Sequence, residues 1–226
     1  DCDGLISGNE IVGNVSRFGG GLHSCKGTIR SNLIEGNTAT DGAGLSSCDG
    51  AIIMANTISR NSATRGGAID DCNSVDVGDN VIVNNSAGID GGALSFCTGL
   101  FSNNFVAFNS AGRLGGGFYV CSGSISNNIV YQNTAETDGG AFYSSSDIFN
   151  NIIGRNRAGF TLEDHGGGLD FCTNVSGNLI FENECGGNGG GMHNISGVIA
   201  NNIVVSNKAN GNGGGAAAIT GDFWNN

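Results

Sequence analysis

The stretch Gly139-Gly140-Ala141-Phe142-Tyr143-Ser144, followed by Asn150-Asn151-Ile152-Ile153-Gly154-Arg155-Asn156, is one copy of a unit that fills the chain. Its second half contains an Asn, two mostly apolar residues, two variable residues and another Asn. This half occurs nine times with the two Asn always five positions apart. The pairs are Asn9 and Asn14, Asn32 and Asn37, Asn56 and Asn61, Asn80 and Asn85, Asn104 and Asn109, Asn128 and Asn133, Asn151 and Asn156, Asn178 and Asn183, and Asn202 and Asn207. Such regular recurrence identifies a repeat protein.

Each repeat also carries a glycine cluster and two apolar columns. Clusters such as Gly66-Gly67-Ala68-Ile69 precede the Asn pairs from the second repeat onward. An Ile, Val or Phe stands three residues before the first Asn of each pair, and an Ile or Val stands two residues after it. Short β-branched runs broken by glycine are typical of brief strands and exclude helices.

A repeat of 23 to 27 residues with two or three short strands must close on itself, so that each strand pairs with its equivalent in the next coil. The sequence therefore predicts an all-β parallel β-solenoid of about nine coils, forming a single domain over residues 1–226. At a strand spacing of about 4.8 Å the rod is roughly 45 Å long. We expect both Asn columns to form structural ladders at bends, because Asn tolerates left-handed backbone and stacked amides can hydrogen-bond between coils.

The repeat resembles those of polymorphic outer membrane proteins. The resemblance rests on Asn-Ser/Thr-Ala, a short spacer and Gly-Gly-Ala-Ile/Leu, as in Asn61 to Ile69, Asn85 to Leu94 and Asn133 to Phe142. These proteins belong to the right-handed parallel β-helix, or pectate-lyase-like, superfamily. The resemblance covers nearly the whole chain and implies a right-handed β-helix in a surface-displayed, usually non-enzymatic adhesin or passenger segment.

Composition limits the classes of partner. The net charge of −11 and pI of about 4.4 disfavour nucleic acid and anionic membrane surfaces. No apolar run reaches the roughly 20 residues of a membrane-spanning helix, so we expect no membrane insertion. The first residue already lies inside the repeat pattern, and we interpret the chain as a mature or excised segment.

Seven of the eight cysteines share one column of the repeat: Cys2, Cys25, Cys48, Cys72, Cys97, Cys121 and Cys172. Adjacent coils bring their Cα atoms within disulfide range, so Cys2–Cys25, Cys48–Cys72 and Cys97–Cys121 are candidate disulfides. The alternative is a buried ladder of free thiols that pack as small apolar side chains. Because no C-x-x-C occurs and a thiolate metal array is the weakest alternative, we expect no metal and no cofactor.

Two further groups of polar residues are candidates for function. Asp70 and Asp170 lie in an outward column two residues before the cysteine column, which we interpret as a solvated face. The two carboxylates are about 19 Å apart by strand spacing, too far to act as a catalytic pair. The seventh linker is the one long linker, and its Glu163, Asp164 and His165 are a candidate irregular loop, because loops on regular scaffolds often carry sites.

The sequence thus favours a non-enzymatic structural or adhesive module that is secreted or displayed at the cell surface. Its expected partners are a surface glycan or protein, or further copies stacked end to end into a filament, because neither terminus has a capping element. A polysaccharide lyase or hydrolase is one alternative. An ice-binding protein is the other, suggested by the row Thr38, Ser62, Ser86, Ser110 and Thr134.

Overall fold

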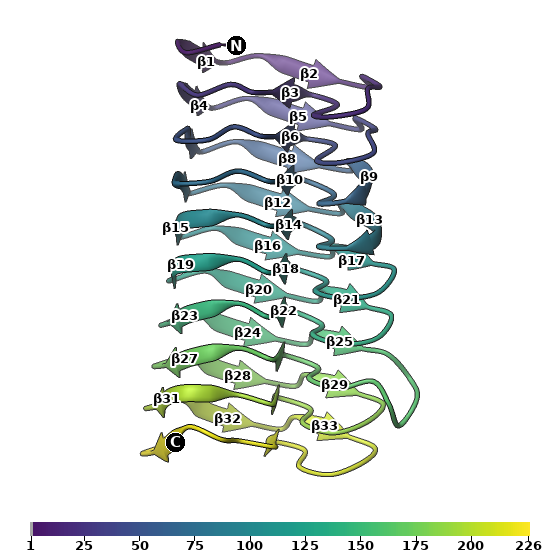
Figure 1. Ribbon diagram of the computed structural model, residues 1–226, viewed down its shortest axis with the longest axis vertical. Coiled ribbons are helices and arrows are strands. Elements are labelled where there is room, and N and C mark those ends of the chain that lie inside the picture. The colour runs from purple at the N-terminus through teal and green to yellow at the C-terminus, as the bar shows by residue number, and fades with distance from the viewer. Residues whose placement is uncertain (1) are drawn as a thin grey trace.

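The computed structural model describes residues 2–226 and confirms a parallel β-solenoid of about nine turns. In Figure 1 the coils lie one above another as a rod with the two termini at opposite ends. Strands with the same place in successive coils form four parallel sheets, numbered here in the order in which each coil visits them. The described residues contain no helix, and therefore no helix that could span a membrane.

The four sheets are built from very short strands. The first sheet contains β1 (Leu5–Ser7), β4 (Thr28–Arg30), β7 (Ile52–Met54), β11 (Val75–Gly78), β15 (Thr98–Ser102), β19 (Ser122–Ser126), β23 (Ser146–Phe149), β27 (Thr173–Ser176), β31 (Ser196–Ala200) and β35 (Asp222–Trp224). The second contains β2 (Glu10–Val12), β5 (Leu33–Glu35), β8 (Thr57–Ser59), β12 (Val81–Val83), β16 (Phe105–Ala107), β20 (Ile129–Tyr131), β24 (Ile152–Gly154), β28 (Leu179–Phe181) and β32 (Ile203–Val205). The third contains β9 (Ser62–Arg65), β13 (Ser86–Asp90), β17 (Ser110–Ala111), β21 (Thr134–Ala135), β25 (Arg157–Ala158), β29 (Glu184–Cys185) and β33 (Lys208–Ala209). The fourth contains β3 (Leu22–His23), β6 (Leu45–Ser46), β10 (Ile69–Asp70), β14 (Leu94–Ser95), β18 (Phe118–Tyr119), β22 (Phe142–Tyr143), β26 (Leu169–Asp170), β30 (Met192–His193) and β34 (Ala216–Ala217).

The apolar columns predicted from the sequence form the core. Ile58 pairs with Ile82, which in turn pairs with Val106, so each core residue stacks on its equivalent. These side chains are fully buried. The Phe118 and Phe142 rings are stacked at a centroid distance of 4.8 Å in the middle of the rod. Stacking like on like keeps the coils in register, because a slip by one residue would turn each core side chain outward.

Both Asn columns form hydrogen-bonded ladders, as predicted. The Asn56 side chain shows the pattern: its Nδ2 donates to Asn80 Oδ1 at 3.1 Å and to the Ile29 carbonyl at 2.8 Å. The backbone N–H of Asn56 also donates to Asn80 Oδ1, at 2.9 Å. Each amide therefore satisfies buried backbone groups at the corners, where the sheets leave them unpaired.

The two ladders run the length of the rod. The first consists of Asn9, Asn32, Asn56, Asn80, Asn104, Asn128, Asn151, Asn178, Asn202 and Asn226. The second consists of Asn14, Asn37, Asn61, Asn85, Asn109, Asn133, Asn156, Asn183 and Asn207. Every predicted rung is therefore present, and Asn226 adds one more at the end of the first ladder.

The expectation that these Asn adopt left-handed backbone is wrong. None of the rungs has positive φ, and Asn37, Asn109 and Asn183 of the second ladder are examples. The residue before each rung has positive φ instead, as Ser31 does at 54° and Arg60 at 54°. A left-handed residue turns the chain, and the following Asn can then direct its amide along the rod axis. At each corner, one residue turns the chain and the next forms the hydrogen bonds between coils. The residue that turns the chain therefore need not be Asn.

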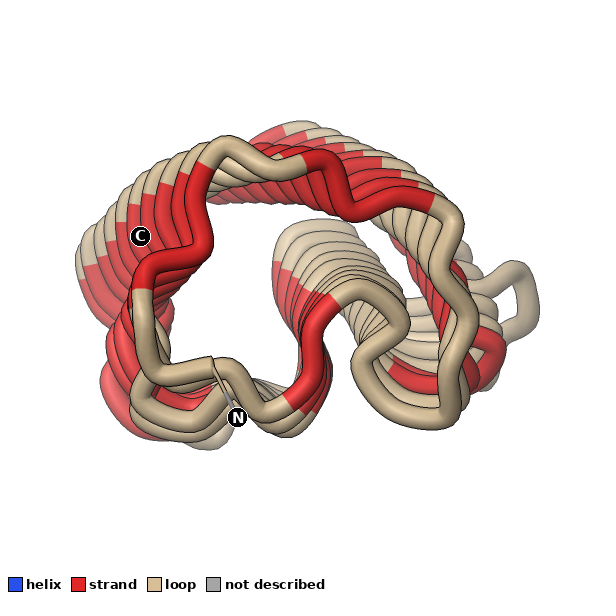
Figure 2. Tube along the Cα trace, turned by 90° about the horizontal axis from the view of Figure 1, so that it is seen from above, coloured by secondary structure: helices blue, strands red, loops and turns tan. Residues whose placement is uncertain are grey.

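The coil is not a simple ring. In Figure 2 the chain folds back toward the interior before it enters the fourth sheet. Glycine permits this close approach: a Cβ at Gly116 would lie 2.4 Å from the Gly140 carbonyl oxygen and 2.5 Å from that of Thr134. Because the chain folds back, the second residue of each fourth-sheet strand lies against the returning linker. The interpretation of this column as a solvated face is wrong, since Asp70 and Asp170 are buried.

Candidate ligand-binding groove

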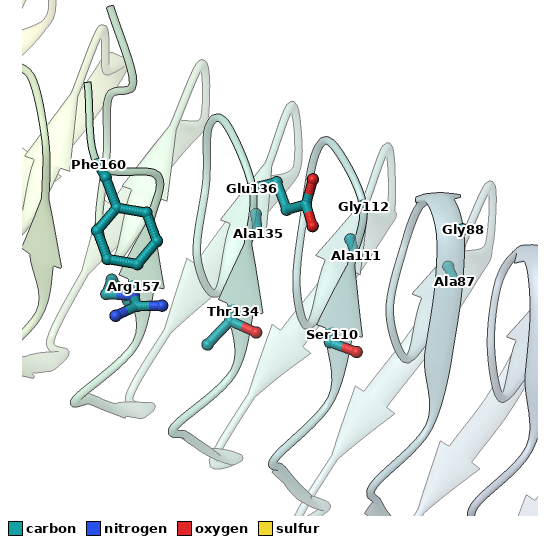
Figure 3. A pocket seen from close by; sticks show the side chains of 10 residues that line it. All are labelled: Ala87, Gly88, Ser110, Ala111, Gly112, Thr134, Ala135, Glu136, Arg157 and Phe160. Carbon is teal, nitrogen blue, oxygen red and sulfur yellow. The ribbon is translucent and has the colours of Figure 1, made fainter. Parts of the chain in front are cut away.

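A groove of about 460 Å³ runs along the outer surface of the third sheet. Its lining comes from four successive coils and consists mainly of small residues, as Figure 3 shows. The lining residues are Ala87, Gly88, Ser110, Ala111, Gly112, Thr134, Ala135, Glu136, Arg157 and Phe160. A volume of this size falls within the range of small-molecule sites.

The repeat itself arranges the polar groups of the groove. Ser110 pairs in register with Thr134, and Thr134 with Arg157, so two hydroxyls and a guanidinium follow one another along the rod. The small residues next in sequence leave room above this row. Glu136 adds a carboxylate on the other side of the groove (Figure 3).

The seventh linker closes one end of the groove. Phe160 is 73% exposed, and its ring centroid lies 4.0 Å from the guanidinium carbon of Arg157. In the described part of the chain Arg157 has no carboxylate within ion-pair distance, unlike Arg113 and Arg155. An aromatic ring over an unpaired cation makes this end the most chemically distinctive part of the groove.

Two of the three candidate loop residues hold the linker in place. The buried Asp164 carboxylate accepts hydrogen bonds from the backbone N–H of Phe160 at 2.9 Å and of Thr161 at 2.6 Å. The His165 backbone N–H donates to Asp138 Oδ1 at 2.6 Å, and its Nδ1 accepts from the Asn188 backbone N–H at 2.9 Å. Glu163 remains exposed. The loop is therefore fixed, and Asp164 orders the backbone that presents Phe160.

A second polar cluster lies between the linker and the fourth sheet. Asp170 Oδ1 is 2.8 Å from His193 Nδ1, and the His193 ring lies 4.4 Å from that of His165. Burial raises the pKa of Asp170 to about 7 and lowers the pKa of His193. Both shifts favour the neutral forms, because burial penalises the charged form of each group. This cluster shares no residue with the groove.

The cysteine column lies where the repeat places it, facing the core. All eight cysteines are free thiols in this structure, and Cys2 alone is exposed. The Cys72 thiol donates to the Asp70 carbonyl at 3.3 Å, while its Sγ accepts from the Cys48 backbone N–H at 3.2 Å. Cys185 lies in the alanine column, paired with Ala158 and Ala209. Oxidation to the candidate disulfides stays a prediction.

Other candidate sites gain no support from the geometry. Among residues 2–226 no three His, Cys, Asp or Glu side chains are grouped to hold a metal ion. The row proposed for ice binding is in register from Ser62 to Thr134, and it borders the groove as a single row. Comparison with known protein families, curated proteins and solved structures finds no match to this chain.

Sequence reasoning identified the seventh linker but not the groove. Phe160 and Arg157 were visible only as parts of an irregular segment, because their approach depends on how the loop folds back. One signal was present: the column that carries Ser or Thr in five successive coils changes to Arg157 in the next coil. A positively charged residue at the end of a Ser and Thr row, next to the one long linker, indicates a candidate site.

Proposed function

We propose that this chain is a non-enzymatic adhesive module of a secreted or cell-surface protein, and that the groove of the third sheet binds an extended surface glycan. The observation that carries the proposal is the exposed Phe160 ring above the unpaired Arg157, at the end of a narrow groove lined with hydroxyl groups. Sugar sites combine an aromatic surface with a few placed polar groups, and this groove offers both.

The repeat spacing suits such a ligand. Equivalent side chains recur about every 4.8 Å along the rod, close to the length of one sugar unit in an extended chain. Ser110 and Thr134 can therefore each bond to hydroxyls of successive sugars, while Phe160 covers the apolar face of a terminal ring. Arg157 favours a carboxylate on that terminal sugar. The net charge of −11 and Glu136 disfavour a polyanion, so a mostly neutral glycan with one acidic end fits best.

A glycan array followed by calorimetry on the bound oligosaccharides tests the proposal. We expect Phe160→Ala to weaken binding at least tenfold, because the stacking surface is lost, and Arg157→Ala to weaken the acidic ligand more than its neutral analogue. Leu162→Ala is the matched control, since Leu162 is 68% exposed on the same loop but does not line the groove.

Two results would count against the proposal. The adhesive role fails if the array shows no glycan bound, or if Phe160→Ala binds as the unaltered chain does. New reducing ends or unsaturated products during incubation with bound glycans would show instead that the chain is a hydrolase or lyase.

A further inference from the structure

The outer surface of the second sheet changes character along the rod. In each three-residue strand the middle side chain enters the core, and the first and third face outward. The strands β2, β5 and β8 place Glu10, Glu35 and Thr57 on that surface. From β12 to β32 (Figure 1) all outward positions are apolar, glycine or tyrosine. We call this surface the apolar face: Val81, Val83, Phe105, Ala107, Ile129, Tyr131, Ile152, Gly154, Leu179, Phe181, Ile203 and Val205.

Much of the apolar face is in contact with solvent. Val81, Ile129 and Ile152 are each 40% or 41% exposed, and Ile203 is 64% exposed. Isolated exposed apolar residues are ordinary on protein surfaces. A contiguous band over six coils is not, and such patches usually mark an interaction site.

Aromatic residues cluster along one side of the apolar face, together with an arginine at its edge. The Phe108 ring, at the corner after β16, meets Tyr131 edge to face at 6.5 Å, and Tyr131 lies 6.5 Å from Phe181. The Arg155 guanidinium lies over Tyr131 at 5.7 Å and is neutralised by Glu182. Aromatic residues and arginine are the types that contribute most binding energy in protein interfaces.

We propose that the apolar face binds the same face of a second copy of this chain, forming a two-fold lateral dimer. Charge selects this face for self-association: two chains of net charge −11 repel each other over most approaches, whereas none of the apolar face's residues is charged. Spacing favours it too. Rows of side chains about 4.8 Å apart interdigitate best with a surface of the same period, and a second copy has that period by construction.

The area of the apolar face determines how strongly we expect two copies to bind each other. Six strands at about 4.8 Å and three residues at about 3.3 Å give a face roughly 29 Å by 10 Å. This is smaller than the roughly 800 Å² per partner of a standard interface, so the dimer is weak and reversible. Ile129 and Ile152 lie at the centre of the apolar face, so they lie at the centre of the dimer interface whether the two rods are parallel or antiparallel.

Sedimentation velocity from low micromolar to near-millimolar concentration tests the proposal. We expect the unaltered chain to shift from monomer to dimer, and Ile129→Lys to raise the dissociation constant at least tenfold. Ile52→Lys is the matched control. Ile52 is 42% exposed and Ile129 is 41% exposed, and each is the first residue of a three-residue strand. Ile52, however, lies on the first sheet and therefore outside the apolar face. Both substitutions change the net charge equally, and circular dichroism checks that both variants fold.

A second pair of variants covers the case in which lysine disturbs the strand. Phe108 and Phe96 both have positive φ and are 47% and 42% exposed, but Phe96 lies beside the fourth sheet. We expect Phe108→Asn to weaken the dimer and Phe96→Asn to leave it unchanged. A chain that stays monomeric throughout, or equal weakening by target and control variants, overturns the proposal. Filaments that persist in Ile129→Lys also overturn it and indicate end-to-end stacking.

Discussion

At the residue scale, each ladder Asn acts through its side-chain amide and not through a left-handed backbone conformation. The repeat spacing was sufficient to predict the ladders, because residues that recur at a fixed step must stack in a closed coil. It was not sufficient to assign the bend. Ser31, Arg60 and Phe108 all adopt positive φ, and their chemical types give no hint of it. Tertiary pairing on both sides of the corner sets their conformation against their own preference.

The buried Asp70 side chain has a consequence for stability against pH. Burial raises its pKa to about 7 from an ordinary 3.8, so folding favours the protonated carboxyl. The stabilising contribution is complete below a pH of about 4 and is lost as the pH rises through about 7. We expect Asp70→Asn to remove this loss and to be more stable than the unaltered chain at a pH of about 8, by on the order of 2 kcal/mol.

Denaturant unfolding at a pH of about 5 and of about 8 measures this difference. Asp71→Asn is the control, because Asp71 is the exposed neighbour and Asn tolerates its φ of 50°. If the unaltered chain and Asp70→Asn lost equal stability between the two pH values, Asp70 would not be the source of the dependence.

At the scale of elements, the first and second sheets were predictable and the fold-back into the fourth was not. Three-residue strands around Ile58 or Val106 alternate clearly enough to reveal which side chain is buried. The two-residue strands of the fourth sheet, such as Ile69–Asp70, have no alternation to detect. Their second residue therefore looked solvated, although the returning linker covers it. The groove depends on the same return of the chain and was hidden for the same reason.

The cysteine column gives a test at this scale. Burial raises the pKa of Cys25 and of Cys172 to about 12 and that of Cys185 to about 11. Thiolate is the reactive form, so these three thiols are inert in the folded chain, and burial keeps a reagent away from the other four buried cysteines. We expect a thiol reagent to label one of the eight cysteines, the exposed Cys2, in the reduced native protein and all eight after denaturation.

Cys2→Ser serves as the control, since it should leave the native protein unlabelled. Labelling of several thiols in the native state would contradict the buried ladder. When the protein is prepared without reductant, fewer than eight reactive thiols after denaturation would reveal the candidate disulfides.

At the scale of the whole molecule, each strand pairs only with its equivalents in the adjacent coils. Stability is then close to a sum over coils and their interfaces. Removal of residues 104–127 deletes one repeat step of 24 residues, so that Asn128 takes the place of Asn104, and keeps every column in register. We expect the shortened chain to fold, with a rod about 4.8 Å shorter.

Small-angle scattering and circular dichroism measure both outcomes. Deletion of residues 104–115 is the control, because half a coil joins unlike columns and should prevent folding. Equal disruption by the two deletions would mean that the rod depends on contacts beyond neighbouring coils.

The ladders also give the rod a direction. Every rung except the last of each ladder donates from Nδ2 to the Oδ1 of the following coil, from Asn9 to Asn32 at one end of the first ladder and from Asn202 to Asn226 at the other. The amide dipoles of two parallel stacks thus add head to tail, and each hydrogen bond polarises the next. A cut across the rod at any level has one surface rich in donors and one rich in acceptors. A further coil could therefore continue the ladders in one orientation only, so the solenoid has a polarity that is set at the level of single side chains.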